Sequence, residues 1–288
     1  MPDRDGYIPG VPCWVDTSQA DPQAAAAFYG ELFAWEVENA MPPESQGTYL
    51  IARLRGGDVA AIAGRREEIP DAPEWSTYVW VDSADEAAAK AWAAGGRVMM
   101  QPFDVPGAGR MSVLRDIEGA EFRVWQAEGH GGAGVVNEHG AVIDAAARFY
   151  GAVFGWEPLS AGPAGGMFRL PGYGDHLEAK EPGLRARLRE AGAPAGFEDV
   201  VAGYAVLGPE QPEAEPGWSV TFSVDDADAA AERAVELGGT VLAAPVDGPW
   251  VRTTLIADPQ GARFRATQFV PENRDVAAQP PQPALRAA

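Results

Sequence analysis

The octapeptide FYGELFAW, Phe28 to Trp35, decides the fold because it recurs later in the chain as FYGAVFGW, Phe149 to Trp156. In each copy an alanine, the Phe, the Tyr and an aliphatic residue follow one another at helical spacing, which predicts a helix with one apolar face. Asp21 and Pro22 precede the first copy and favour a helix start there. An aromatic helix at the same place in both halves indicates an internal duplication.

The duplication extends well beyond the octapeptide. PEWSTYVWVDSADEAAAKAWAAGG, residues 73–96, matches PGWSVTFSVDDADAAAERAVELGG, residues 216–239. DIEGAEFRVWQ, residues 116–126, matches DPQGARFRATQ, residues 258–268. Each half reads as two successive βαβββ modules, so the chain holds four. The sequence therefore predicts an α+β fold in which two homologous domains each form a cupped mixed sheet with helices outside.

The domain boundaries follow from the repeat. We expect a first domain over residues 6–128, a Gly-rich linker over 129–134 whose glycines supply backbone freedom, and a second domain over 135–270. The second half carries extra sequence that includes GLRARLREAGAP, residues 183–194, which is predicted to be a helix. This helix is either a plain surface helix or a lid over a cavity. The Pro- and Ala-rich tail, residues 271–288, is predicted to be disordered.

Composition narrows the class of protein. With 288 residues and 46% hydrophobic residues the chain is globular, and no apolar run is long enough to span a bilayer. A start without signal-peptide features predicts a cytoplasmic protein. The net charge of −20 repels nucleic acid and anionic membranes and favours neutral or cationic small ligands, unless it serves solubility alone. The single Cys13 excludes an intramolecular disulfide and is predicted to be a buried, inert thiol.

The repeated motifs, taken in order, resemble the vicinal oxygen chelate superfamily, which includes glyoxalase I, extradiol dioxygenases and bleomycin-resistance proteins. More narrowly, the chain is similar to two-domain glyoxalase-like proteins of actinobacteria, some of them encoded beside antibiotic-biosynthesis genes. The resemblance covers residues 8–270. It implies cupped sheets and, in members with metal chemistry, a divalent metal held by His or Gln, Glu, His and Glu from four strands.

This sequence departs from those metal ligands. A divalent metal needs several converging N or O donors, and arginine, a permanent cation, would repel it. We therefore expect no metal and no cofactor, and we expect the three histidines to lie on the surface. The resemblance places the ligand positions at Trp14 (Val135 in the repeat), near Ala52 or Arg53, at Ser76 (Ser219) and at Arg123 (Arg265), and the histidines are His130, His139 and His176.

Strand alternation suggests what lines the first cup instead. If Trp14 occupies the first ligand position, Asp16 shares its face, and Arg123 and Trp125 share a face on the last strand. Two indoles with an acid and a guanidinium between them suit a flat aromatic ligand with polar edges. Asp16 and Arg123 could equally form a salt bridge that only fills the space.

The second half offers different residues on the matching face. Without a gap these are Val135, Asn137 and His139, whereas a one-residue deletion would place Glu138 opposite Asp16. The equivalent arginines Arg110 and Arg252 are either a structural clamp or an anion contact in each cavity, and Trp35 and Trp156 are predicted to be core residues. Further ligand-binding candidates are Tyr49, Trp80, Trp250 and Arg265.

Two functions remain. The first is metal-independent binding of a small aromatic natural product, for sequestration, resistance or delivery, which the resemblance to the bleomycin-resistance branch favours. The second is a natural-product tailoring enzyme that uses Asp16 or Glu138 as a general base and an arginine to stabilise an enolate or phenolate. A protein–protein interaction module fits the duplication but not the polar, aromatic cavity. We expect a small aromatic or cationic partner and a monomer with an internal pseudo-dimer.

Overall fold

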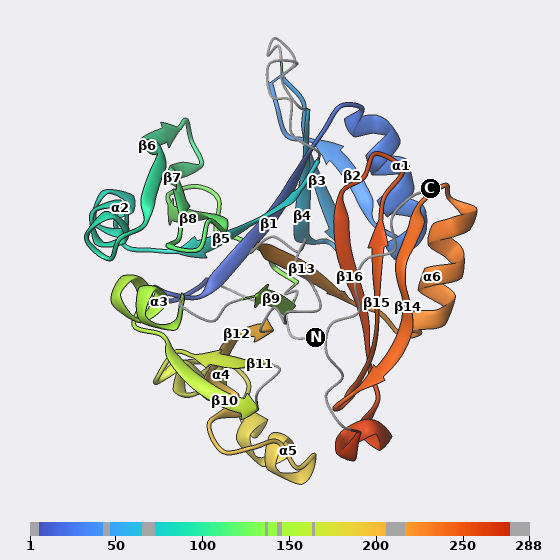
Figure 1. The fold of residues 1–288 in the computed structure, drawn as a ribbon. Coiled ribbons are helices and arrows are strands. Elements are labelled where there is room, and N and C mark those ends of the chain that lie inside the picture. Colours follow the sequence, from blue (N-terminus) through green and yellow to red (C-terminus); the bar gives the residue numbers. More distant parts are fainter. Residues whose placement is uncertain are drawn as a thin grey trace.

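The computed structural model describes residues 6–42, 47–64, 73–135, 138–142, 146–162, 165–205 and 217–276. They form two eight-stranded mixed sheets, one from each half of the sequence, with matching strand orders (Figure 1). The predicted α+β fold of paired βαβββ modules is confirmed. None of the helices in this part of the chain has the length and apolar character needed to cross a bilayer.

The first half builds one sheet in the order β2-β3-β4-β1-β5-β8-β7-β6. Strands β1 and β5 meet antiparallel at its centre and join the two modules. The first module contains β1 (Pro12–Gln19), α1 (Pro22–Phe33), β2 (Glu36–Asn39), β3 (Tyr49–Leu54) and β4 (Gly57–Gly64). The second contains β5 (Trp75–Trp80), α2 (Ala84–Ala93), β6 (Arg97–Val105), β7 (Gly109–Arg115) and β8 (Glu121–Ala127).

The second half repeats this plan in the order β10-β11-β12-β9-β13-β16-β15-β14. Its first module contains β9 (Glu138–Val142), α3 (Ala146–Phe154), β10 (Glu157–Gly162), β11 (Gly165–Arg169), α4 (Tyr173–Lys180), α5 (Leu184–Glu190), the short 3-10 helix η1 (Phe197–Asp199) and β12 (Val200–Ala205). Its second contains β13 (Trp218–Ser223), α6 (Ala227–Glu236), β14 (Thr240–Gly248), β15 (Val251–Ala257), β16 (Arg263–Phe269) and the 3-10 helix η2 (Pro271–Asp275).

Local sequence signals start the helices where they were expected. The Asp21 carboxylate accepts hydrogen bonds from the first backbone amides of α1, with Pro22 at the first turn, and the Ser83 hydroxyl does the same for α2 through the Glu86 amide. Asp226 repeats the arrangement at α6. These caps satisfy amides that have no partner inside the helix, and they fix where each helix leaves its sheet.

The recurring octapeptide joins the two halves to each other. The Tyr29 hydroxyl on α1 donates to Asp258 in the turn before β16 at 2.9 Å, and the Tyr150 hydroxyl on α3 donates to Asp116 in the matching turn before β8 at 3.0 Å. We call these two contacts the Tyr–Asp clasps. The indole N–H groups of Trp75 and Trp218 donate to the same two hydroxyls. The motifs that recur in the sequence are therefore the residues of a pseudo-symmetric contact between halves.

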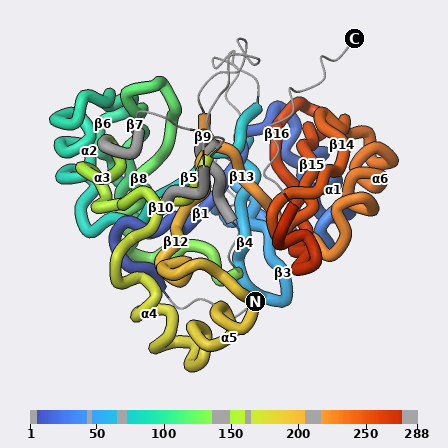
Figure 2. Tube along the Cα trace, turned by 60° about the horizontal axis from the view of Figure 1, so that its bottom comes forward, coloured from blue at the N-terminus to red at the C-terminus, as the bar shows by residue number. Residues whose placement is uncertain are grey.

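The helices of each half pack against the helices of the other. In one core α1 meets α6, with Phe28 and Phe33 against Phe222 and Phe264; in the other α2 meets α3, around Phe122. Figures 1 and 2 show these pairs on opposite sides of the molecule. Trp35 and Trp156 lie in the two cores, as predicted. Each half thus buries its helical face against its partner, while its concave face points elsewhere.

Two connecting segments differ from the sequence prediction. Residues 129–134 are not a free linker: Ala133 donates to the Cys13 carbonyl of β1 at 2.8 Å, and Gly134 donates to Asp58. Disorder is wrong for the start of the tail, because η2 is held by the Asn273 amide, which donates to Asp247 and to the Val251 carbonyl. Residues 277–288 lie outside the described residues.

The inserted sequence forms two helices, not one. The predicted helix at 183–194 is α5, shorter than expected, and α4 precedes it, so His176 lies on a helix and not in a turn. The Glu178 carboxylate accepts from the amides of Gly183 and Arg185 and thereby starts α5. At the far end of the insertion, a side chain at Gly192 would contact Trp250, between β14 and β15. The insertion therefore reaches from β11 to the opposite edge of its sheet.

Candidate ligand site

The concave face of the first sheet, here called the first cup, is filled by its own side chains. Trp14 on β1, Tyr78 on β5, Met111 on β7 and Trp125 on β8 are buried in one cluster, and Tyr49 on β3 packs against it. Since β3 and β7 are far apart in the strand order, their meeting shows that the sheet curves around this cluster. The structure thus brings the predicted aromatic residues of the first cup together.

Asp16 lies at the centre of the first cup and is 5% exposed. Its carboxylate accepts from Arg123 Nη1 at 2.9 Å and from the Tyr78 hydroxyl at 2.6 Å, with the Tyr49 hydroxyl at 3.4 Å. Tyr49 accepts in turn from the Trp14 indole at 3.0 Å, and the Arg123 guanidinium lies 5.3 Å from the centre of the Tyr78 ring. Asp16 and Arg123 therefore form a salt bridge inside a connected network, one of the two interpretations that the sequence left open.

The electrostatics of the network follow from burial and from Asp16. Burial raises the pKa values of Tyr49 and Tyr78 well above the ordinary phenol value, and the nearby Asp16 raises them further. Burial alone would lower the pKa of Arg123, but Tyr78 and Asp16 outweigh it, so its pKa is raised. Both phenols stay protonated and Arg123 stays charged, which occupies the Asp16 oxygens. The structure therefore gives no support to Asp16 as a general base.

Residues from outside the sheet close the first cup. The imidazole of His130 packs 4.5 Å from the Trp14 ring and 6.0 Å from the Trp125 ring, and Trp125 donates to the His130 carbonyl. Tyr7 stacks on Trp80 at 5.9 Å and donates to the Ala133 carbonyl. The prediction that His130 is a surface residue is wrong, because two indoles cover its ring; burial lowers the pKa of His130. We call Tyr7 and residues 130–133 the plug.

Two predicted ligand contacts lie on the other side of their sheets. Arg110 on β7 pairs with Asp85 of α2 and with Asp104, and Arg252 on β15 pairs with Asp228 of α6 and with Asp247. Each arginine ties a helix start to an edge hairpin on the helix-covered face. The structure therefore supports the structural-clamp interpretation of this pair and places neither residue in a cup.

Strand register defines which residues of the second cup, the matching face of the second sheet, correspond to those of the first. Tyr78 pairs with Trp14 and Arg123, and Thr221 pairs with Glu138 and Arg265. The substitutions from first cup to second are Trp14 to Glu138, Asp16 to Gly140, Tyr49 to Gly165, Tyr78 to Thr221, Met111 to Thr253 and Trp125 to Thr267.

This register corrects the sequence alignment of the second half. Glu138 matches Trp14 and not Asp16, because the chain between the first strand and the FY pair is shorter in this half. Val135 lies before the strand, and His139 pairs with Val220, whose side chain belongs to the helix-side core. Asn137 lies outside the described residues, as do the side chains of Glu138 and His139. Their predicted roles remain predictions.

Two positions of the second cup are more exposed than their counterparts in the first. Thr253 and Thr267 are half-buried, whereas Met111 and Trp125, which match them, are buried. The Thr253 and Thr267 hydroxyls lie 2.8 Å apart and share a hydrogen bond. Small polar side chains with glycine beside them thus stand where the first cup has its aromatic filling.

Arg265 differs from its counterpart Arg123 in its charge environment. Gly140 takes the place of Asp16, and among the side chains that the structure describes no carboxylate pairs with Arg265. Burial lowers the pKa of Arg265, and no described acid offsets that effect. The guanidinium nevertheless stays charged at neutral pH, because arginine's intrinsic pKa is so high.

Trp250 lies at one end of the second sheet. Its ring stacks on Phe269 at 6.2 Å, with the planes 1° apart, and Phe269 is 62% exposed. Phe269 follows Arg265 and Thr267 at alternate positions of β16, so this aromatic pair continues the line of the cup-facing residues. Together with the end of the inserted α5 segment it forms one edge of the second cup, a combination that the sequence did not reveal.

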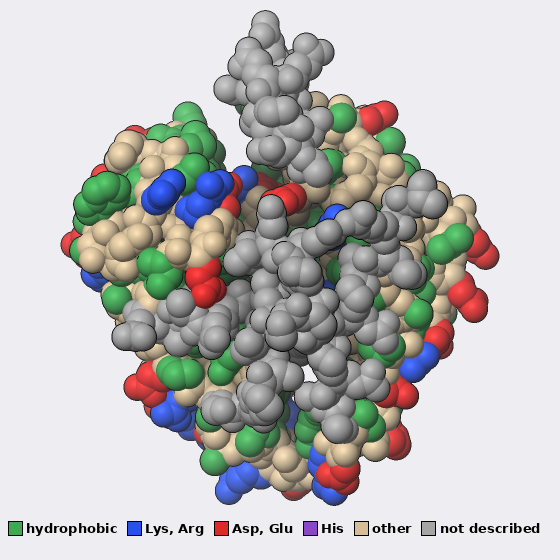
Figure 3. Space-filling model, viewed as in Figure 1, with side chains coloured by type: hydrophobic (Ala, Val, Ile, Leu, Met, Phe, Trp, Pro, Cys, Tyr) green, Lys and Arg blue, Asp and Glu red, His purple; other side chains and the backbone are tan. Residues whose placement is uncertain are grey.

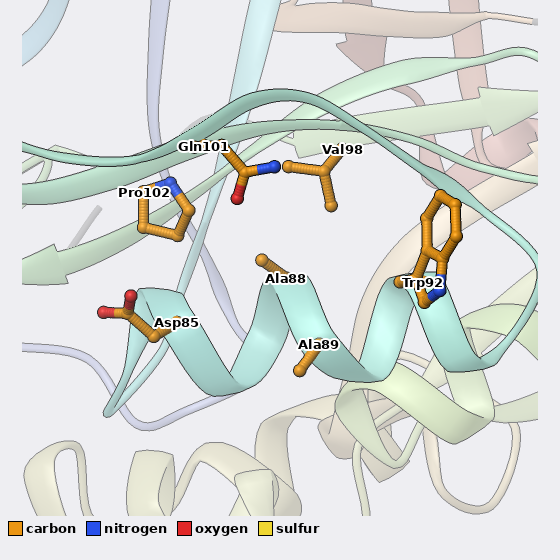
Figure 4. Close-up of a pocket in the computed structure, with 7 residues that line it drawn as sticks. All are labelled: Asp85, Ala88, Ala89, Trp92, Val98, Gln101 and Pro102. Atoms are coloured by element: carbon orange, nitrogen blue, oxygen red, sulfur yellow. The ribbon is translucent and has the colours of Figure 1, made fainter.

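A groove lies on the surface of the first half, outside the cups. Its volume is about 480 Å³, and it lies between α2 and β6, lined by Asp85, Ala88, Trp92, Val98 and Pro102 among others (Figure 4). Trp92 is 69% exposed there. On the face seen in Figure 3, acidic and basic side chains are interspersed around the rim, so no single charged patch dominates it. Cys13 is a buried free cysteine, as predicted, and burial raises its pKa.

Comparison with known proteins identifies the family of this chain. A model of the glyoxalase-like domain matches the chain twice, over residues 14–125 and 135–267. The chain belongs to the glyoxalase-like family. It is 38% identical over 287 residues to "Putative glyoxylase CFP32" of Mycobacterium tuberculosis, covering 94% of this chain and 100% of that protein. It is 33% identical over 287 residues to the anthracycline biosynthesis protein DnrV of Streptomyces peucetius, covering 91% and 94%.

Solved structures of this superfamily share the fold. The Mn(II)-bound glyoxalase from Novosphingobium aromaticivorans superposes with a TM-score of 0.56 at 15% identity, covering 90% of this chain and 82% of its own. A variant of homoprotocatechuate 2,3-dioxygenase from B. fuscum gives 0.56 at 12% identity, covering 92% and 72%. The glyoxalase-like chain is thus a two-domain protein of the vicinal oxygen chelate superfamily.

The donors of this glyoxalase-like protein do not fit the metal that some superfamily members hold. Within the described residues no three His, Cys, Asp or Glu side chains converge. In the first cup Arg123 is already paired with Asp16. Ala52 faces the helix-side core, and Arg53 is a cation already paired with Glu38 and Asp58. The register adds one carboxylate residue, Glu138, to the second cup, which corrects the expectation that Val135 stands there.

Proposed function

We propose that this glyoxalase-like protein binds a small, flat aromatic molecule in its second cup, for sequestration, resistance or delivery of a natural product. One observation carries the proposal: the side chains that fill the first cup are replaced in the second by Gly165, Thr221, Thr253 and Thr267. Thr253 and Thr267 are half-buried where Met111 and Trp125 are buried, as expected for a concave face that its own side chains fill less completely. The first cup supports the second by building a rigid half of the molecule.

The chemistry of the second cup suits such a guest. Threonine hydroxyls and strand backbone offer polar contacts at the edges of a ring system, and glycine positions let a flat face approach the sheet closely. The Trp250–Phe269 stack at the edge offers a further aromatic surface. The relatives named for anthracycline biosynthesis support a polycyclic aromatic guest.

The test refills the second cup. Thr267→Trp restores the indole that Trp125 supplies in the first cup, and affinity for a coloured hydroxyanthraquinone is measured by titration. We expect binding to weaken at least about 10-fold, which corresponds to roughly 1.4 kcal/mol. Val235→Trp is the matched control, because it adds the same side chain at an exposed α6 position whose counterpart is Trp92. Equal affinity in wild type and Thr267→Trp would contradict the proposal.

A second candidate function has its own observation. Glu138, Thr221 and Arg265 are neighbours in register across β9, β13 and β16, so a possible base and a possible oxyanion partner share one row of the sheet. A tailoring enzyme would use Glu138 to take a proton and Arg265 to stabilise the resulting enolate or phenolate. Glu138→Gln should then abolish conversion of the bound molecule, as followed by mass spectrometry, while affinity stays within a few-fold. A binder would show no conversion in either protein.

A further inference from the structure

The two cups differ in charge as well as in aromatic content. In the first half, Arg123 and Asp16 neutralise each other at 2.9 Å inside the protein. In the second half the equivalent arginine is kept and the equivalent acid is lost, because Gly140 has no side chain to offer. The first cup therefore holds an Arg–Asp pair at this position. In the second cup Gly140 replaces the Asp, and Glu138, whose side chain lies outside the described residues, stands in the place of Trp14.

An uncompensated guanidinium on a half-buried face is costly. It has lost part of its hydration, and attraction to an anion grows as water is excluded. The hydroxyls of Thr253 and Thr267, the neighbours of Arg265 on β15 and β16, bond to each other, and Thr253 also donates to the Ala266 carbonyl. The protein keeps five N–H donors at a place where its duplicate keeps an internal salt bridge. A ligand that brings its own acidic oxygen would take the place of the Asp16 carboxylate.

We propose that the molecule bound in the second cup carries an acidic oxygen, a carboxylate or an ionised phenol or enol, and that Arg265 pairs with it as Arg123 pairs with Asp16. This inference rests on the proposed function and names the class of its ligand. Arginine matches a carboxylate or a pair of adjacent ring oxygens through two parallel N–H donors, which also fixes the ligand's orientation. The net charge of −20 works against anions at long range, so the selectivity for an acid comes from contact with Arg265.

The test uses two probes of one shape: anthraquinone-2-carboxylate and the neutral anthraquinone-2-carboxamide. Calorimetric titration of the full-length protein should show the carboxylate binding at least about 10-fold more tightly than the amide, as expected for a hydrogen-bonded charge pair. Arg265→Gln should bring the two affinities within about 2-fold of each other, and Arg265→Lys should keep part of the preference because it keeps the charge. Arg252→Gln removes the same charge from the outer face of the same module and should leave the preference intact.

Each outcome decides something. Equal binding of carboxylate and amide by the wild-type protein would overturn the role of Arg265 while leaving aromatic binding in the second cup standing. Binding of neither probe would overturn both. A preference that disappears equally in Arg252→Gln would show that overall charge, and not the cup, selects the acid. Thermal unfolding of each variant checks that it is folded, and Arg265→Lys keeps the test valid if Arg265→Gln is unstable.

Discussion

The two cups of this molecule share strand order and register but not contents. In the first, Trp14, Tyr78 and Trp125 fill the concave face and Asp16 neutralises Arg123. In the second, the same positions carry Glu138, Thr221 and Thr267, and Gly140 takes the place of Asp16 while Arg265 is retained. The comparison shows that, in a duplicated fold, the concave face of one half can be packed with side chains while that of the other half is not. A fold that uses both concave faces for ligands would show similar polarity in both.

The largest expected effect comes from removing the acid of the first cup. Asp16→Ala leaves the half-buried Arg123 without its partner and removes the acceptor of the Tyr78 hydroxyl. We expect the free energy of unfolding, measured by urea titration, to fall by about 3–5 kcal/mol. The double variant Asp16→Ala with Arg123→Met should recover much of this loss, because no charge is then left unpaired. A loss of under about 1 kcal/mol for the single variant would mean that water already reaches Asp16, and that the first cup is open like the second.

The next test addresses the plug. Gly132 has φ +86°, and a Cβ there would lie 2.8 Å from the Cys13 carbonyl and 2.7 Å from the Tyr7 ring, so Gly132→Ala should cost about 2–3 kcal/mol. Gly131 has nothing within 4 Å of its Cβ position, and Gly131→Ala is the matched control, expected within about 0.5 kcal/mol of wild type. Chemical denaturation measures both. Equal effects would show that the plug does not depend on this close approach.

The smallest expected effects come from Tyr→Phe variants at the two Tyr–Asp clasps. Tyr150→Phe should cost about 2 kcal/mol, because Asp116 Oδ2 then has no described hydrogen-bond donor. Tyr29→Phe should cost about 1 kcal/mol, since Gln19 still donates to Asp258 Oδ2 at 2.8 Å. Midpoints of urea unfolding compare the two. The reverse order would mean that the clasps are not limited by these carboxylates.

Most of the architecture was readable from the sequence, whereas the identity of the open cup was not. The octapeptide, the caps and the DPxG-type turns recur because they perform the same local task in both halves, so the repeat predicted four modules and the core positions of Trp35 and Trp156. Strand alternation also placed Trp14, Asp16 and Arg123 on one face. These features depend on residues close together in the sequence and on the alternation of side chains along a strand, and both can be read from the sequence.

The predictions that were wrong depend on contacts between residues far apart in the sequence. The shortened connection before α3 moved the register, so Glu138 and not Val135 matches Trp14. The sequence predicts His130 on the surface because it lies in a Gly-rich segment. In the structure this segment runs along β1 and places the imidazole against the rings of Trp14 and Trp125. Arg110 and Arg252 were candidates for anion contacts, and their acids lie on helices that the alignment could not bring near. In the first cup the predicted site residues pack against one another, and Asp16 is paired with Arg123.

The Tyr–Asp clasps have a consequence for how such a protein could arise. The helical face of each half packs partly against the opposite half, so a lone half would expose an apolar surface and would associate with a copy of itself. In that ancestral pair any substitution would appear twice, and a change that plugged one concave face would plug both. In a single fused chain the two concave faces can change independently, and in this protein they carry different side chains.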